Sequence, residues 1–230
     1  EVNCLYQSSS GYIWAGTDGG LYRTNGSGFQ SIDLWDTDRN DLYSINCITQ
    51  TSDGRMWVGT DNYGLFYIEE GRTYHLQEEY YDGIKSILSI VEGADGTLYV
   101  ASTNGLYTIA KAETDTRGDD SGFCLLEYTD ASISKIEFRG LILKGEEIWG
   151  LSGDGKIYIF NQEQILRQIQ VSEESGEDLN SIALCGENVY VGSTGRDVYV
   201  YESSTRKDTL VAGVDGINTF MRDSEGRVWV

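Results

Sequence analysis

Residues 53–66 read DGRMWVGTDNYGLF, and this stretch decides the fold because close copies of it lie on both sides. Residues 10–22 read SGYIWAGTDGGLY, and residues 95–107 read DGTLYVASTNGLY. Weaker copies, EIWGLS, NVYVGS and EGRVWV, begin at residues 147, 188 and 225. Self-similarity at a nearly fixed period indicates a repeat architecture. The chain is therefore expected to consist of one structural unit that recurs along the sequence.

The aromatic residue of each copy sets the period of the repeat. These residues lie 43, 42, 50, 41 and 39 residues apart, at Trp14, Trp57, Tyr99, Trp149, Tyr190 and Trp229. A period of about 40–45 residues with several short strands per repeat is typical of β-propeller blades. The longest spacing contains a polar insertion at residues 111–122, whose Arg117-Gly118-Asp119 tripeptide we interpret as a coincidental match to an integrin-binding motif.

Each copy is expected to form four strands. They are rich in β-branched and aromatic residues, are bounded by Gly, Asn and Asp, and show no helical period. In the first two repeats we predict strands at residues 2–6, 12–16, 21–23, 29–32, 45–50, 56–59, 65–68 and 73–76. The prediction is one all-β β-propeller domain over residues 1–230, with five four-stranded blades plus a partial sixth. The repeats are placed at about 1–43, 44–83, 84–132, 133–178, 179–215 and 216–230.

The two ends of the chain lead us to expect a fragment of a larger ring. Glu1 is not an initiator residue, and the chain stops after the second strand of its sixth repeat. Propellers usually close by completing one blade with strands from both ends of the chain. At about 43 residues per blade, a seven-bladed ring needs roughly 300 residues. We therefore expect part of a seven-bladed propeller, either as an open arc or self-associated through its open ends.

Two recurring features are expected to serve packing. The tryptophans Trp14, Trp57, Trp149 and Trp229 recur at one strand position per blade, so we interpret them as core residues and not as a ladder for stacking on sugars. The innermost strands carry a small residue just before an apolar one, because these strands converge on the propeller axis. These small residues are Cys4, Cys47, Ser89, Gly140, Ser181 and Thr219.

The four cysteines are Cys4, Cys47, Cys124 and Cys185, and none belongs to a C-x-x-C pair. Neither a zinc knuckle nor a thioredoxin-type site is therefore expected. Cys4 and Cys47 hold equivalent positions on adjacent innermost strands. They are either free core thiols, which we favour, or a bridge between the two strands.

The recurring string Gly-x-Ile/Met/Val-Trp-Val/Ala-Gly-Thr-x-x-Gly-Leu-Tyr/Phe resembles the two-component regulator propeller repeat. The resemblance covers the whole chain, and it is weaker in the fourth and fifth repeats, where Gly-Thr is replaced by Leu151-Ser152 and Gly192-Ser193. The resemblance implies the extracytoplasmic sensor region, periplasmic or at the cell surface, of a bacterial membrane histidine kinase, hybrid two-component protein or diguanylate cyclase. It also implies an output domain in the parent protein and membrane attachment only through the parent chain.

One face of the propeller is expected to carry the ligand site. Loops that link blades and loops between second and third strands open on the same face, which is the usual ligand site of this fold. Aromatic rings beside carboxylates and amides can stack on a sugar and hydrogen-bond its hydroxyls. The family resemblance implies an oligosaccharide or another small extracellular ligand, and these residue types would permit it. The predicted ligand-binding residues are Trp35, Asp36, Asp38, Arg39, Tyr43, Asp61, Asn62, Tyr63, Tyr80, Tyr81, Asp154 and Arg196.

Charge excludes several kinds of partner. The chain has 37 acidic and 17 basic residues and a formal net charge of −20. Nucleic acid and anionic membrane surfaces should repel it. No apolar run approaches the roughly 18 residues that a membrane span needs. Asp36-x-Asp38-x-Asn40 resembles the start of a calcium loop but lacks the Gly and Glu expected later in it, so no metal site is predicted.

Catalysis is not expected. The single histidine, His75, lies on a predicted outer strand, so a His-based triad or multi-His metal site is excluded. No cofactor is predicted. The favoured function is a ligand-sensing or partner-binding module that is non-catalytic by itself. The alternatives are a protein-interaction scaffold without a small ligand and, less favoured, a propeller lyase such as the streptogramin lyases.

Overall fold

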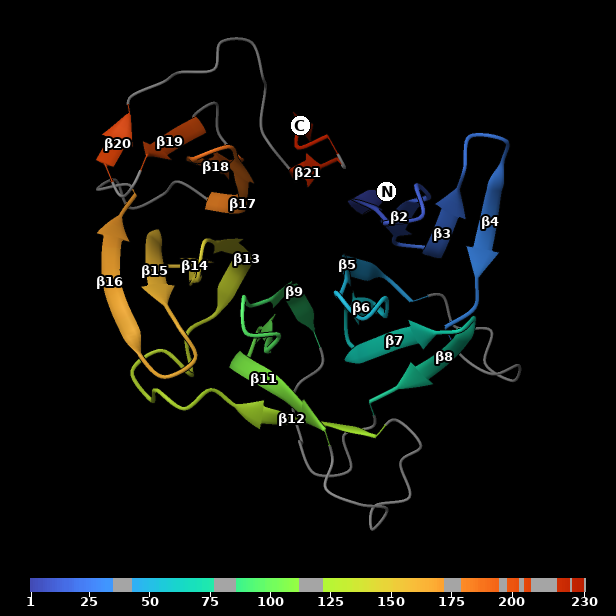
Figure 1. Cartoon of the computed structure of the whole chain (residues 1–230), viewed down its shortest axis with the longest axis horizontal. Coiled ribbons are helices and arrows are strands. Elements are labelled where there is room, and N and C mark those ends of the chain that lie inside the picture. Colours follow the sequence, from blue (N-terminus) through green and yellow to red (C-terminus); the bar gives the residue numbers. More distant parts are fainter. Residues whose placement is uncertain are drawn as a thin grey trace.

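The computed structural model describes residues 1–34, 43–76, 86–111, 122–171, 179–194, 198–202, 205–207, 219–223 and 225–229. In these ranges the chain forms strands and turns and no helix. The strands make five antiparallel sheets of four and one of two, each with its strands in sequence order. The predicted all-β propeller of five four-stranded blades and a partial sixth is confirmed (Figure 1).

The strands of each blade run from the propeller axis outward. Blade one contains β1 (Val2–Gln7), β2 (Ile13–Thr17), β3 (Gly20–Thr24) and β4 (Phe29–Ile32). Blade two contains β5 (Ile45–Gln50), β6 (Met56–Thr60), β7 (Leu65–Glu69) and β8 (Arg72–His75). Blade three contains β9 (Ile87–Glu92), β10 (Leu98–Ser102), β11 (Gly105–Lys111) and β12 (Phe123–Glu127). Blade four contains β13 (Phe138–Lys144), β14 (Glu147–Ser152), β15 (Lys156–Phe160) and β16 (Ile165–Gln170). Blade five contains β17 (Leu179–Cys185), β18 (Asn188–Ser193), β19 (Val198–Glu202) and β20 (Thr205–Lys207). The two strands of the sixth sheet are β21 (Met221–Arg222) and β22 (Val228–Trp229).

The innermost strands form a ring around the axis. Each innermost strand of the first five blades contacts that of the next blade, and β21 contacts both β17 and β1. Figure 1 accordingly shows β21 beside the N-terminus of the chain. At the level of the innermost strands the ring is thus continuous, which differs from the open arc expected from the sequence. Self-association through the ends stays a prediction.

Most of the recurring aromatic residues are core residues, as predicted. Trp57, Tyr99 and Trp149 are almost completely buried, and Trp14 packs with apolar residues of blade two. Trp229 is the exception, because its side chain is 53% exposed. Trp229 belongs to the two-stranded sixth blade, where no further described strand covers it. In this chain Trp229 is therefore less covered than the other three tryptophans.

A cysteine on the innermost strand pairs with a glycine on the second strand in blades one and two. This pairing explains why the repeat has glycine two residues after the aromatic residue. Cys47 pairs with Gly59 across β5 and β6. A Cβ on Gly59 would lie 2.5 Å from Cys47 Sγ and 2.6 Å from Ile87 Cγ2 of blade three. The same arrangement holds for Cys4 and Gly16 in blade one. Each thiol therefore lies over the glycine of its own blade, at the interface with the next blade. Both cysteines are free, so the alternative of a bridge is wrong.

Blade four departs from this pattern by exchanging volume between strands. Gly140 stands on β13 where the other four-stranded blades have Cys or Ser, and it pairs with Leu151 on β14. Leu151 is fully buried against blade five. The Gly-to-Leu change on the second strand is thus matched by a smaller residue on the first, which keeps the interface filled.

The hydroxyl that follows the glycine closes the next hairpin. Thr17 and Thr60 Oγ1 donate hydrogen bonds to the carbonyl oxygens of Gly20 and Gly64, at 2.9 and 2.8 Å. Ser152 Oγ makes the equivalent bond to Lys156 O at 2.9 Å. The weaker repeats therefore keep the hydroxyl even where they lose the glycine.

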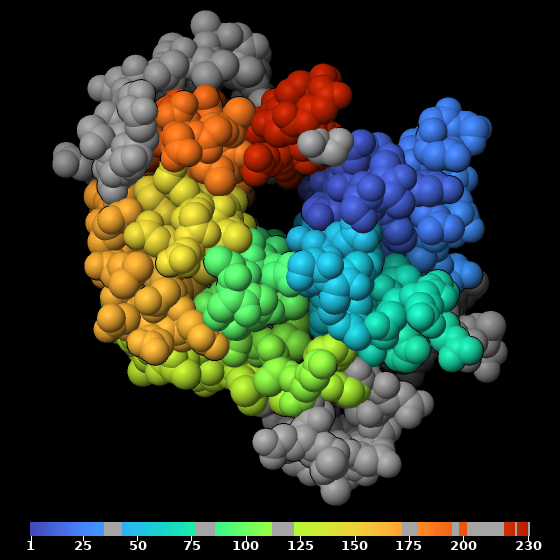
Figure 2. Space-filling view, viewed as in Figure 1, coloured from blue at the N-terminus to red at the C-terminus, as the bar shows by residue number. Residues whose placement is uncertain are grey.

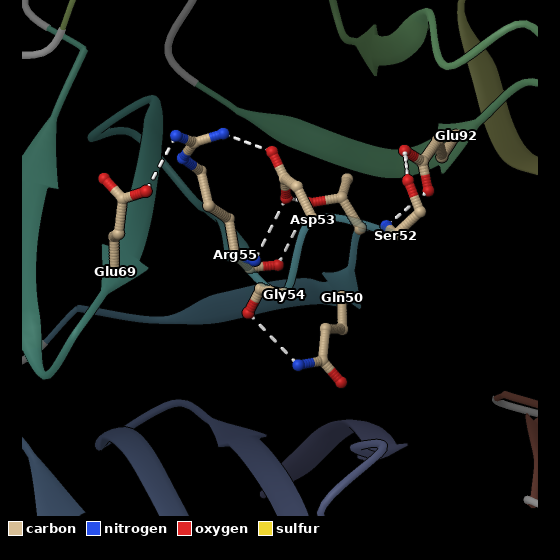
Figure 3. Close-up of polar contacts among 8 residues, drawn as sticks. Gln50, Ser52, Asp53, Gly54, Arg55, Glu69 and Glu92 are labelled. Atoms are coloured by element: carbon tan, nitrogen blue, oxygen red, sulfur yellow. Dashed lines mark hydrogen bonds and ion pairs between the residues drawn. The ribbon is translucent and has the colours of Figure 1, made fainter.

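The turns between the first and second strands of a blade lie on the side of the propeller opposite to the turns between second and third strands, and they join adjacent blades there. In blade two, Ser52 N and Oγ donate to the carboxylate of Glu92, the last residue of β9, at 2.7 Å each (Figure 3). Arg55 lies between Asp53 and Glu69, with its guanidinium 2.7 Å from Glu69 Oε1. Its guanidinium also lies over the Phe123 ring of blade three, at 5.1 Å. One short turn thus joins two blades by polar and aromatic contacts.

Candidate binding face

The turns between second and third strands meet the connections that enter the same blades. Backbone hydrogen bonds join Asp61 N to Ser44 O at 2.8 Å and Thr103 N to Ser86 O at 3.2 Å. Gly153 N donates likewise to Glu137 O at 3.1 Å. These turns and connections therefore share one side of the propeller, which we call the loop face. The space-filling view shows the molecule hollowed at its centre, between the blue N-terminal strands and the yellow blade four (Figure 2).

Five of the twelve predicted ligand-binding residues lie in the described part of the chain. Tyr43, Asp61, Asn62 and Tyr63 come together at the loop face of blade two. Asp154 lies apart from them, in the β14–β15 turn of blade four. The others lie outside the described residues: Trp35, Asp36, Asp38, Arg39, Tyr80, Tyr81 and Arg196.

The blade-two residues form a fixed turn. Asp61 Oδ1 accepts a hydrogen bond from Ser86 Oγ, and Asp61 Oδ2 accepts one from Asn62 Nδ2 at 2.9 Å. The ring of Tyr63 meets that of Tyr43 edge to face, with centroids 4.4 Å apart. Tyr43 is itself buried in the core between blades one and two. The turn therefore combines a carboxylate, an amide and an aromatic ring in one place.

A second polar cluster fastens blade one to blade two on the same face. Asn3 Nδ2 donates to Asp18 Oδ1 at 2.9 Å and lies 3.3 Å from Ser44 Oγ. Hydrogen bonds from Asn3 and from the N-terminal ammonium of Glu1 hold the pKa of Asp18 below its usual value. Asp18 and Asp61 thus place two acidic side chains on the loop face of adjacent blades.

Asp154 is bound to its own hairpin. Lys156 Nζ lies 2.6 Å from Asp154 Oδ2, and Ser152 Oγ donates to Oδ1. Partial burial alone would raise the pKa of Asp154, but the hydrogen bonds from Lys156 and Ser152 lower it overall. Its described contacts fit a residue that stabilises the turn. Its predicted role in ligand binding stays untested.

The sequence prediction missed a set of bulges at the loop end of the innermost strands. In each of the first five blades, one residue near the start of the innermost strand is skipped by the pairing with the second strand. β-bulges re-aim side chains and often lie beside functional sites. The skipped residues are Asn3, Asn46, Leu88, Arg139 and Asn180.

Three of the bulge side chains reach the next blade or the connection that enters it. Asn46 Nδ2 donates to Ile87 O at 3.1 Å, and Arg139 Nη1 donates to Leu179 O at 3.0 Å. Asn3 reaches Ser44, the residue before β5. The sequence does contain a signal for these bulges: a polar residue recurs directly before the small residue of the innermost strand. These bulges fasten the blades at the mouth of the central axis.

His75 lies on the outer strand β8, as predicted. Its ring stacks on Phe66, with centroids 4.3 Å apart, and Nε2 lies 2.8 Å from Tyr63 O. These contacts connect the blade-two turn to the outer strand. No group of three or more metal-ligating side chains gathers among the residues that the structure describes. Within those residues there is also no helix long and apolar enough to span a membrane.

Comparison with known proteins places these observations in a family. Residues 40–62 match the family model described as two component regulator propeller. The matched segment runs from the connection that enters blade two to its second turn, and it contains Tyr43, Asp61 and Asn62. The sequence comparison with curated proteins finds no significant match.

Solved structures share the fold at low sequence identity. The extracellular domain assigned to a hybrid two-component system of B. thetaiotaomicron is 20% identical, with a TM-score of 0.67 over 99% of this chain. The chain spans only 30% of the length of that protein. A virginiamycin B lyase from Staphylococcus aureus is 13% identical, with a TM-score of 0.72 over 98% of this chain and 75% of the lyase. The WD40 β-propeller domain of Doa1 is 14% identical, with a TM-score of 0.68 over 99% of this chain and 74% of that domain.

The structural likenesses establish the propeller fold, and the family model identifies the repeat. The repeat resemblance inferred from the sequence is thereby confirmed. This chain is a β-propeller that carries a two-component regulator propeller repeat at residues 40–62.

Proposed function

We propose that the chain is the ligand-sensing or partner-binding module of a bacterial membrane signalling protein, extracytoplasmic and non-catalytic by itself. The observation that carries this proposal is the family match at residues 40–62, which covers the blade-two part of the loop face. The likeness to an extracellular domain of a two-component system supports the same location and role. The signalling output would come from another part of the parent protein.

The ligand proposed for the loop face is an oligosaccharide. A half-exposed tyrosine lies there beside an amide and a carboxylate, within three consecutive residues. An aromatic ring offers a flat apolar surface to a sugar ring, and the polar groups can hydrogen-bond its hydroxyls. The acidic loop face disfavours anionic ligands, because Asp18 and Asp61 would repel them.

A calorimetric titration with defined sugars tests this proposal. Cellohexaose, xylohexaose, maltohexaose, mannohexaose and a hexamer of galacturonic acid would each be added to the 230-residue chain. We expect binding of at least one neutral hexasaccharide and none of the galacturonic acid hexamer. Absence of binding by every neutral sugar would overturn the oligosaccharide proposal.

The structural likeness to a lyase raises catalysis as the competing function. A variant of the Staphylococcus aureus enzyme in which a histidine is replaced by alanine is described as catalytically inactive. In this chain the single histidine, His75, lies on an outer strand with its ring against Phe66. We therefore expect quinupristin to remain intact after prolonged incubation with the chain, as followed by mass spectrometry. Cleavage of quinupristin would contradict the non-catalytic assignment.

A further inference from the structure

The blade-two turn on the loop face is longer than its counterparts. In blade one, Thr17 pairs with Gly20, so two residues form the turn. In blade three, Ser102 pairs with Gly105, again with two residues between them. In blade two, Thr60 N donates to Gly64 O at 3.0 Å, so the turn contains three residues. Alignment of the two Gly-Thr-Asp strings shows that blade two has gained one residue, and that its turn carries an aromatic side chain where blade one has glycine.

That aromatic residue, Tyr63, is exposed on a rigid support. Its side chain is 39% exposed, although its ring packs edge to face on the buried Tyr43. Its carbonyl oxygen lies 2.8 Å from Nε2 of His75, the only histidine of the chain. The ring is therefore offered to solvent with little freedom to move, which lowers the entropy cost of binding.

The backbone of this turn includes a left-handed residue other than glycine, which the blade-one turn does not have. Asn62 has a φ of 70°, in the left-handed region that residues with a Cβ disfavour. Its amide is held by Asp61 Oδ2, and Asp61 in turn is bound by Ser86. Blade one closes the same hairpin with Asp18-Gly19, in which neither residue is left-handed, although Asp18 also accepts hydrogen bonds from Asn3 and Ser44. Strain of this kind persists where the surrounding structure enforces it, commonly at ligand sites.

We propose that Tyr63 is the stacking platform of the binding face, placed over blade two and away from the propeller axis. It would bind the flat apolar side of a neutral sugar ring, with Asp61 and Asn62 at the border of the platform. Asn62 is a positioning residue, because its left-handed backbone sets the direction of the ring. This inference rests on the proposed function and specifies the contact that provides affinity.

Variants of this turn test the proposal in the 230-residue chain. Tyr63→Ala removes the ring, and Tyr63→Phe keeps it. A third variant combines Asn62→Gly with deletion of Tyr63, which reproduces the Asp18-Gly19-Gly20 turn that blade one already folds. Phe29→Ala is the matched control, because Phe29 is an exposed ring on the outer strand β4. Each variant would be titrated with the neutral hexasaccharides named above, and thermal unfolding would be recorded alongside.

We expect Tyr63→Ala and the shortened turn to weaken sugar binding by about tenfold or more, as truncation of an anchoring aromatic residue does. Tyr63→Phe and Phe29→Ala should bind within about threefold of the unaltered chain. Retained affinity in Tyr63→Ala and in the shortened turn would overturn the platform while leaving the proposed function in place. Failure of the unaltered chain to bind any of these sugars would overturn both.

Discussion

The glycine of the repeat is required by the groups that face it from two directions. Gly59 lies between the Cys47 thiol of its own blade and the Ile87 side chain of the next. Burial raises the pKa of the Cys4 thiol to about 12, and it also raises that of Cys47, so both stay protonated and act as small apolar groups. The cysteines therefore serve packing and not chemistry.

Replacement of this glycine should destabilise the protein. Gly59→Ala places a Cβ within 2.6 Å of Ile87 Cγ2, so the free energy of unfolding should fall by about 1–3 kcal/mol. Gly19→Ala is the control, because a Cβ there meets only Thr17 Oγ1, at 3.8 Å. Urea unfolding would measure both variants. Equal stability of the two would show that the blade interface yields easily at Gly59.

Equivalent tryptophans should differ in their contribution to stability. Trp57 is 1% exposed, so Trp57→Ala should cost about 3–5 kcal/mol. Trp229 holds the same place in the repeat but is half exposed, so Trp229→Ala should cost about 1 kcal/mol or less. Chemical denaturation of the two variants would measure the difference. A similar loss in both would mean that Trp229 is buried in solution.

Adjacent blades are joined both on the loop face and on the opposite face of the propeller. On the loop face, the bulge residues Asn46 and Arg139 donate to backbone carbonyls of the next blade. On the opposite face, the first turn of blade two binds Glu92 of blade three. Blades fastened at both ends resist sliding past one another. If the proposed function holds, recognition on the loop face would therefore occur on a rigid surface.

The first turn of blade two, which contains Asp53, should make the stability of the protein depend on pH in the acidic range. Partial burial alone would raise the pKa of Asp53, but bonds from Thr51 and Arg55 lower it overall. The unfolded chain therefore binds a proton at Asp53 before the folded chain does as the pH falls. The stabilisation is present above the ordinary Asp pKa of about 3.9 and is lost as the pH drops through the folded value.

Asp53→Asn isolates this contribution. Because the Asp53 side chain is half exposed, the variant should lose no more than about 1 kcal/mol at pH 7. The difference from the unaltered chain should shrink between about pH 5 and pH 2. Urea unfolding across this range would measure it. A difference that is independent of pH would assign the loss to packing.

The sequence predicted the elements well because each blade repeats the same local pattern. The alternation of β-branched residues and turn glycines sufficed to place the strands of blades one and two within about two residues. The bulges were missed, because a skipped residue depends on how two strands pair and not on the pattern of one. The long turn at Tyr63 was visible in the sequence, but its support by His75 and Tyr43 joins residues that only the folded blade brings together.

In the whole molecule, electrostatic repulsion between acidic residues opposes the closure of the ring of blades. A formal net charge of −20 places repulsion across the entire ring. Four large apolar clusters, each shared by two adjacent blades among the first five, oppose that repulsion. The interface between blades one and six is different, since Val2 and Trp229 are both 53% exposed. The equivalent positions in blade two, Ile45 and Trp57, are almost completely buried.

This difference predicts where the ring opens first. The contacts of β21 with β1 join strands that have little apolar cover, so local opening there should cost less free energy than at any other blade boundary. Hydrogen exchange followed by mass spectrometry should therefore show β21, β22 and β1 exchanging earlier than β5, β9 and β13. Added salt should slow exchange at that boundary, because it screens the repulsion across the ring. Uniform protection of all the innermost strands would show instead that the contact between β21 and β1 is as stable as the complete blade interfaces.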